Sequence, residues 1–143
     1  MANLTLHDVF GYVNGAGPGN LATCSPAGEP HVSLAFAVRM GDDVVFTMRT
    51  SSAKAANLRA NPRLSLMWQA NSAETYLWGR AIIEDDTATK AEVWSGGHIP
   101  FDLSHFYGSV DSPGWCVVRV VPSRAVVMAQ TENGLERHTW SAQ

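Results

Sequence analysis

The fold of this chain is decided by the stretch VFTMRTSSAKAANLRANPRLSL, residues 45–66. Residues 44–48 are β-branched, aromatic or apolar and predict a strand. Residues 51–60 predict a short helix that stops at Asn61 and Pro62, because proline cannot continue a helix. Residues 64–69 predict the next strand. The stretch therefore encodes a strand, a bend, a helix and a second strand.

The same stretch is locally cationic within an acidic chain. No acidic residue occurs between Asp43 and Glu74, whereas the net charge of the whole chain is −3. Four cationic side chains fall in this interval and give it a local charge of about +4: Arg49, Lys54, Arg59 and Arg63. A cationic island in an acidic chain points to an anionic ligand.

The bend before the helix offers further groups to such an anion. A helix N-terminus presents unpaired N–H groups and the positive end of the helix dipole, and Thr50, Ser51 and Ser52 add hydroxyl donors. Lys54 falls in the first helical turn, where the dipole disfavours a cation unless an anion is bound. The alternative is an ordinary cap formed by Ser51 or Ser52, with Lys54 in solvent.

The strand predicted over residues 31–40 suggests where a flat ligand could lie. Its large apolar side chains alternate and are expected to face the barrel core: Val32, Leu34, Phe36 and Val38. The other face is expected to point outward and carries mostly small side chains, which let a planar ring approach the backbone: His31, Ser33, Ala35 and Ala37. Alternatively, a helix or a partner subunit covers this small-residue face.

The remaining elements predict a mainly β, α+β domain. Helical patterns occur at residues 6–13, 86–94 and 100–107, the first behind a Thr5–Asp8 capping box. Strand patterns occur at residues 21–25, 75–83, 115–121, 125–130 and 135–140, with hairpin turns at residues 41–43 and 133–134. Strands close in sequence, with helices inserted between them, predict an antiparallel split β-barrel with short outer helices. We expect one domain over residues 1–143.

Composition excludes several classes of protein. The chain has 143 residues, of which 45% are hydrophobic and 16% charged, so a packed core is expected and disorder is not. A pI near 5.9 argues against nucleic-acid binding. No signal peptide or membrane-spanning apolar run is recognisable. Cys24 and Cys116 form no metal or disulfide pattern, which is typical of free thiols in the cytoplasm.

The order of these motifs resembles the pyridoxamine 5′-phosphate oxidase-like superfamily, whose members share an FMN-binding split barrel. The specific part is residues 45–66: a strand ending in an aromatic residue and threonine, a Ser-x-Lys segment, and a helix ending in an Asn-Pro-Arg turn. The segments around Pro30 and Ser33, around Gly79 and Ala81, and at residues 115–122 are also similar to the family.

The resemblance implies a set of site residues. Family members are homodimers with two cofactors in clefts between the subunits. The phosphate would be held by Arg49, Ser51, Ser52 and Lys54, and Thr47 and Met48 would border the ribityl chain. Trp68 and Gln69 would lie near the cleft. Backbone groups would line the flavin ring along Ser33, Leu34, Ala35, Phe36, Ala37 and Val38.

Two departures from the family pattern argue against true pyridoxamine 5′-phosphate oxidase activity. Ser33 stands where the oxidase carries a phosphate-binding arginine, and residues 132–143 lack its C-terminal arginine signature. The resemblance therefore implies an FMN-dependent oxidoreductase acting on another small molecule, with a nicotinamide or deazaflavin electron donor. A deazaflavin-coenzyme-dependent reductase, a flavin- or heme-binding storage protein and a barrel without cofactor remain alternatives. No residue is singled out as catalytic.

Other kinds of functional site have less support in the sequence. His98 and His105 are seven residues apart, a spacing that matches no standard metal site, so no metal is expected. A hydrolase elbow of the form Gly-x-Ser-x-Gly does not occur. Residues 15–20 are rich in glycine but precede a strand, so they are interpreted as a linker and not as a phosphate loop.

Overall fold

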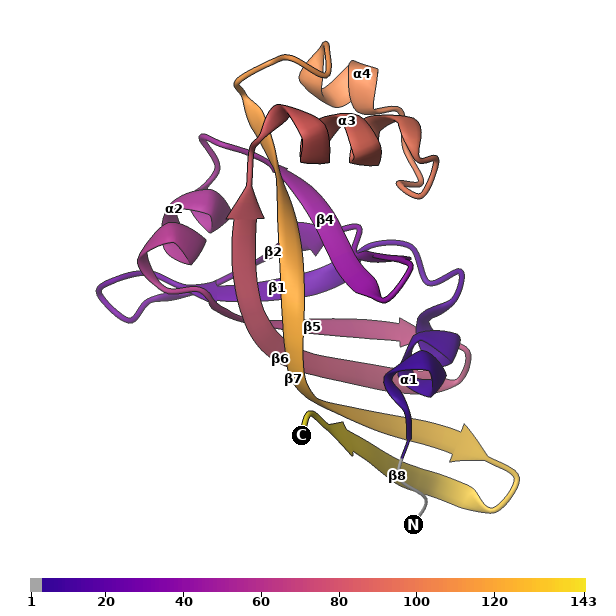
Figure 1. Cartoon of the computed structure of the whole chain (residues 1–143). Helices are drawn as coiled ribbons and strands as arrows, with labels where there is room; N and C mark the ends of the chain where they lie inside the picture. The colour runs from indigo at the N-terminus through magenta and orange to yellow at the C-terminus, as the bar shows by residue number, and fades with distance from the viewer. Residues whose placement is uncertain (1–3) are drawn as a thin grey trace.

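The computed structural model describes residues 4–143, which form eight strands and four helices (Figure 1). In chain order the elements are α1 (Leu6–Val13), β1 (Gly19–Cys24), β2 (Pro30–Ala35), β3 (Val38–Met40), β4 (Asp43–Arg49), α2 (Ala53–Ala60), β5 (Arg63–Ala70), β6 (Ala73–Glu84), α3 (Thr87–Ser95), α4 (Leu103–Tyr107), β7 (Trp115–Thr131) and β8 (Gly134–Ser141).

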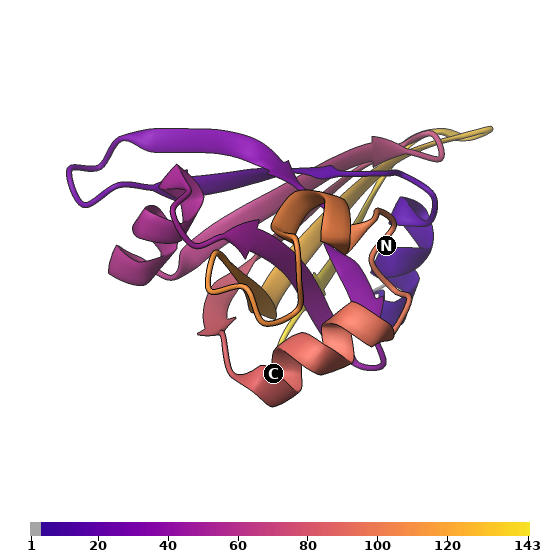
Figure 2. The same cartoon turned by 90° about the horizontal axis from the view of Figure 1, so that it is seen from above.

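All strand pairs are antiparallel and follow the order β2-β1-β5-β6-β7-β4-β3, with β8 added to β7. The strands lie between α1 and α2, which occupy opposite sides of the molecule in both views (Figures 1 and 2). The short helices α3 and α4 lie together at one end of β7, and the β7–β8 hairpin extends from the other end (Figure 1). The predicted split barrel with outer helices is confirmed.

One long strand, β7, replaces two predicted strands. Residues 115–121 and 125–130 were expected to be separate, but β7 runs unbroken from Trp115 to Thr131 and pairs with β6 from Val117 to Ala129. Its first half also pairs with β4 and its second half with β8, so Pro122 falls between the two ladders and its missing N–H interrupts neither. The register shifts between Trp78 and Gly79, opposite this point.

The core has two parts that meet at β4. The larger cluster fills the barrel and includes Leu21, Phe46 and Leu77, and the smaller one packs α3 and α4 on the other side of β4 and β7. Residues 44–48 are all buried, because β4 is covered on both faces. This two-sided burial explains why the strand reads as a continuous apolar run without alternation.

The prediction for the faces of β2 is wrong. Val32 and Leu34 are 68% and 59% exposed, whereas Ala35 and Ala37 are 4% and 9% exposed. Ser33 pairs with the fully buried Leu21, so the small side chains point inward. The strand also breaks after Ala35, and Phe36 is only partly buried. The small side chains of this segment therefore face the interior, and the large ones lie on an open outer face.

Helix starts follow local capping. The Thr5–Asp8 capping box forms as predicted, and Asp86 caps α3 through the Thr89 N–H. The predicted helix at residues 100–107 begins only at Leu103, because Asp102 caps it by accepting a hydrogen bond from the Ser104 N–H. Over residues 4–143 there is no helix long and apolar enough to cross a membrane.

Candidate functional site

The first part of the site is a cationic bend, which we define as residues 49–54 together with Arg59. Strand β4 ends at Arg49, and the Thr50 N–H donates to the Gly114 carbonyl at 3.0 Å. The Ser52 hydroxyl donates to the Arg49 carbonyl at 2.7 Å and accepts from the Ala55 N–H at 3.2 Å. Ser52 is therefore the N-cap of α2, as one of the two interpretations of the sequence required, and its hydroxyl is already engaged.

Lys54 reaches from the first turn of α2 to the end of β2. Its Nζ donates to the Leu34 carbonyl oxygen at 2.7 Å, and the side chain is partly buried instead of lying free in solvent. Burial lowers the pKa of Lys54 below its usual value, because removing the ammonium from water disfavours the charged form. A bound anion would favour the charged ammonium and offset this effect of desolvation.

Each of the two arginines of the bend contacts a neighbouring group. The Arg49 guanidinium lies 5.7 Å from the centre of the Tyr107 ring, and Arg59 Nη1 donates to the Thr50 carbonyl at 3.0 Å. Within residues 4–143, the side-chain ion pairs involve Arg119 and His138 and none of these cations. The positive charge of the bend is thus not neutralised by a carboxylate.

A buried hydroxyl without a partner lies on β2, one residue before the carbonyl that Lys54 contacts. Ser33 Oγ is buried and forms no hydrogen bond with the described residues, and the neighbouring Leu34 carbonyl is the one that Lys54 contacts. His31 Nδ1 is also unpartnered, two residues along the same face. Buried polar atoms usually have partners. The Ser33 hydroxyl and the Lys54 ammonium are both hydrogen-bond donors of the kind that a phosphate accepts from.

Thr47 and Met48 lie on opposite faces of β4. Thr47 Oγ1 is 3.0 Å from the Tyr107 hydroxyl, and burial raises the pKa of Tyr107. Met48 is 2% exposed and packs in the barrel core, so only its backbone can approach a ligand. Ser51 is exposed at the bend, and Arg63 starts β5 outside it.

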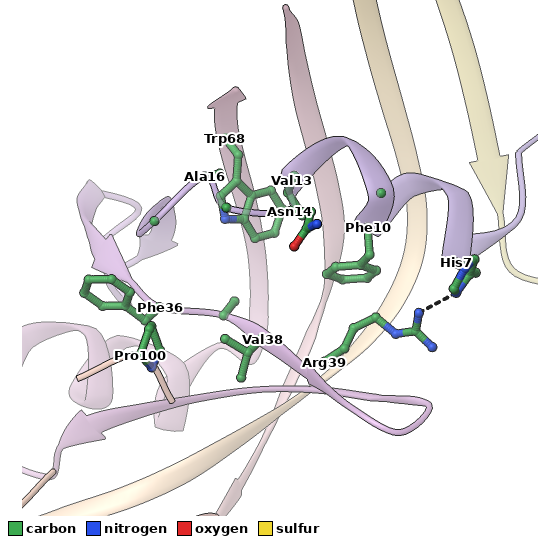
Figure 3. A pocket seen from close by; sticks show the side chains of 14 residues that line it. His7, Phe10, Val13, Asn14, Ala16, Phe36, Val38, Arg39, Trp68 and Pro100 are labelled. Atoms are coloured by element: carbon green, nitrogen blue, oxygen red, sulfur yellow. Dashed lines mark hydrogen bonds between the residues drawn. The ribbon is translucent and has the colours of Figure 1, made fainter. Parts of the chain in front are cut away.

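The second part of the site is a pocket of about 680 Å³ (Figure 3). It is formed by one side of α1, the loop at residues 15–17, the β2–β3 connection at residues 36–37, the first two residues of β3, Trp68 and Pro100. Trp68 is 2% exposed and covers Gly19, where an added Cβ would lie 2.7 Å from the indole nitrogen. Three predicted ring-lining residues therefore line this pocket together with Trp68: Phe36, Ala37 and Val38.

The bend and the pocket are connected by residues 34–38. Lys54 contacts this segment at Leu34, and the pocket begins two residues later at Phe36. Gln69 is separate, since it is exposed and lines a different hollow with Glu74 and Gln130. Among the described residues no cluster of three potential metal ligands occurs, so His98 and His105 form none there.

Sequence reasoning missed the contribution of α1 and the loop after it. His7, Phe10 and Val13 line the pocket, as does the loop at residues 15–17 that was interpreted as a linker. Residues 6–13 were predicted only as a helix behind a capping box. A signal was present in the glycines, because Gly15 and Gly17 adopt positive φ and shape the turn beside the pocket.

The chain matches one protein family over most of its length. The profile of the family described as pyridoxamine 5′-phosphate oxidase matches residues 9–128. Comparison with curated proteins gave no match.

Solved structures share the fold at low sequence identity. A protein related to general stress protein 26 of B. subtilis (pyridoxinephosphate oxidase family), from Clostridium acetobutylicum, is similar with a TM-score of 0.76 and 17% identity over 95% of this chain and 93% of that chain. PhzG from Burkholderia lata 383, in complex with tetrahydrophenazine-1-carboxylic acid, gives 0.74 and 13% over 96% and 85%. A heme binding protein from Mycobacterium smegmatis gives 0.71 and 18% over 96% and 59%.

Proposed function

The chain belongs to the pyridoxamine 5′-phosphate oxidase family, and from this premise we propose that it binds FMN and serves as a flavin-dependent oxidoreductase acting on a small molecule. The observation that carries the proposal is the hydrogen bond from Lys54 Nζ to the Leu34 carbonyl, next to the unpartnered Ser33 hydroxyl. The contact places a cation against β2, one residue from a free donor, and no carboxylate of the described residues pairs with Lys54.

In this proposal each part of the site has its own task. Lys54, Arg49 and the Ser33 hydroxyl bind the phosphate, with Ser51 at the rim, whereas Ser52 keeps the start of α2 in place. Backbone groups of residues 34–38 hold the ring edge, and Trp68 bounds the pocket beside it. FMN supplies the redox chemistry when bound. The residues of this chain bind and orient it and shape the space for a substrate.

A deazaflavin coenzyme and heme are the alternative cofactors. A deazaflavin coenzyme also carries a phosphate and would use the same cationic bend. Heme is an alternative because a heme binding protein from Mycobacterium smegmatis has a similar structure. At 18% identity, that similarity shows a shared fold alone. The visible absorption spectrum of the protein purified from its native host distinguishes flavin, deazaflavin and heme in one measurement.

We further propose that the protein is a homodimer that buries the outer face of β2. Val32 and Leu34 are exposed on this face. Ladder pairing continues the face across β1 to Met67 on β5 and Tyr76 on β6, both partly buried. The β1 residue in this row is the exposed Asn20, so the face is mixed, with apolar side chains on β2, β5 and β6. A largely apolar sheet face is a typical interface between subunits, and a second copy of the chain offers the same face in return.

Replacement of Lys54 tests the phosphate site directly. We expect Lys54→Ala to weaken FMN binding by about 10- to 100-fold, because a hydrogen bond to a charged group contributes about 1.5–3 kcal/mol. Binding is measured by quenching of flavin fluorescence. Riboflavin has the same ring without the phosphate, so its affinity should change little.

Arg63→Gln is the matched control, since Arg63 is an exposed cation of the same segment outside the bend. Equal losses for FMN and riboflavin in Lys54→Ala, or an equal loss of FMN in Arg63→Gln, would contradict the assignment. Failure of the wild-type protein to bind either flavin would remove the proposed function.

A further inference from the structure

One end of the pocket carries a cation that the phosphate site does not use. Arg39 extends from β3 toward α1, at the end of the pocket opposite Phe36 and Pro100 (Figure 3). Its Nη1 lies 2.7 Å from His7 Nδ1, and its Nη2 donates to the Gly41 carbonyl at 3.0 Å. A guanidinium has five N–H donors, so three remain available.

Arg39 differs from the arginine that the fold uses structurally. Arg119 is paired with the carboxylates of both Asp43 and Glu84. Arg39 has no carboxylate partner among the described residues, and the lining of the pocket contains no Asp or Glu. Its two contacts instead fix the direction of the side chain: one to the hairpin turn and one to α1. A guanidinium held in this way is suited to a planar carboxylate, which it can bind with two parallel hydrogen bonds.

The rest of the lining is mainly apolar and includes the aromatic rings of Phe10, Phe36 and Trp68. Its other polar side chains are His7 and Asn14. Phe10 and Trp68 meet edge to face with ring centres 6.3 Å apart, and Phe36 lies at the far end beside Pro100. Val13 and Val38 add aliphatic surface. The volume of about 680 Å³ is within the range of small-molecule sites, which typically combine an apolar lining with a few placed polar groups.

We propose that this pocket binds a planar aromatic monocarboxylate, with its ring among Phe10, Phe36 and Trp68 and its carboxylate on Arg39. A single cation at one end of an apolar pocket matches one negative charge. A phosphate dianion is matched better at the cationic bend, which carries both Lys54 and Arg49. That the bound acid is the substrate of the enzyme rests on the proposed function, whereas its binding does not.

The test uses 2-naphthoate as the probe and 2-naphthylmethanol as its neutral counterpart, titrated by calorimetry into FMN-free protein. We expect 2-naphthoate to bind the wild-type protein and Arg39→Gln to lower its affinity at least about tenfold, as expected for a charge-assisted hydrogen-bonded pair. The affinity of the neutral alcohol should stay within twofold, which also reports that the pocket is still folded. Arg39→Lys keeps the charge and should recover part of the loss.

Arg63→Gln removes an exposed arginine outside the pocket and should change neither probe. The proposal is overturned if 2-naphthoate does not bind the wild-type protein at millimolar concentration. It is also overturned if Arg39→Gln leaves the affinity unchanged or weakens both probes equally. FMN retention, measured on the same variants, is expected to be unaffected by Arg39→Gln. Binding of 2-naphthoate by a protein that binds no FMN would refute the proposed function and leave this inference standing.

Discussion

At the scale of single residues, the burial of Lys54 gives FMN binding a pH dependence. The pKa of Lys54 lies below its usual value because of desolvation, and only the charged form attracts a phosphate. We therefore expect FMN affinity to fall as the pH rises through this lowered pKa, before an ordinary lysine would titrate. Fluorescence titrations across pH 7–11, with riboflavin as the reference for changes in the ring, measure the effect.

Lys54→Arg provides the matched variant, because arginine stays charged throughout this range. It should bind FMN with an affinity that changes little with pH. Without ligand the sign is opposite for stability. Between the lowered pKa and 10.5 the unfolded chain binds more protons at this residue, so the free energy of unfolding rises with pH there. A wild-type affinity for FMN that is flat with pH would show that Lys54 does not contact the phosphate.

Single residues also show which features of the candidate site could be predicted from the sequence. The absence of acidic residues between Asp43 and Glu74 marked the cationic bend correctly as a place of unneutralised charge. The role of Ser52 could not be assigned, because a phosphate ligand and a helix cap require the same residue type at the same position. The direction of Lys54 was not predictable either, since its partner, the Leu34 carbonyl, belongs to a strand 20 residues earlier.

At the scale of elements, the bulge between β6 and β7 depends on Gly79. A Cβ at this position would lie 2.4 Å from the Val121 carbonyl oxygen and 3.1 Å from Pro122 Cα, both backbone atoms of the paired strand. We expect Gly79→Ala to destabilise the protein by about 1–3 kcal/mol, because the ladder must shift to admit the methyl group. Chemical denaturation measures the change.

Gly11→Ala is the contrasting substitution. Gly11 lies within α1 and an added Cβ would meet nothing within 4 Å, so alanine should stabilise the helix by up to about 1 kcal/mol. Similar effects from both substitutions would show that the close approach at Gly79 does not control the stability of the bulge.

Element boundaries were predictable where local chemistry sets them and not where pairing does. The Thr5–Asp8 box formed as predicted, and it is contained in four residues, as is the Asp86 cap. The continuity of β7 depends on two different partner strands on either side of Pro122, which no local pattern reveals. The faces of β2 were predicted in reverse because alternation identifies two faces but not which one the barrel encloses.

At the scale of the whole molecule, the outer face of β2 should control the oligomeric state. Val32 is 68% exposed in the isolated chain, and we expect Val32→Glu to weaken the dimer at least about tenfold, because burying an unpaired carboxylate is costly. Light scattering measures the mass: twice 15.4 kDa for the wild-type protein and 15.4 kDa for the variant at micromolar concentration.

Leu135→Glu serves as the comparison, since Leu135 is 64% exposed at the start of β8, on the hairpin that extends from the barrel (Figure 2). It should leave the dimer intact. Dissociation by Leu135→Glu alone would assign the interface to the hairpin, and a wild-type mass of 15.4 kDa would exclude the dimer.

The contact between Lys54 and Leu34 has a mechanical consequence. Strand β2 is the edge strand on one side of the sheet, and β3, paired with β4, is the edge strand on the other. These two edges are not paired with each other. Lys54, on the helix that follows β4, donates a hydrogen bond to the carbonyl of Leu34, the penultimate residue of β2. A phosphate bound there would link β2 to the start of α2 across the two unpaired edges. Amide hydrogens of β2 should then exchange more slowly when the protein is loaded with FMN, while those in the β7–β8 hairpin keep their rates.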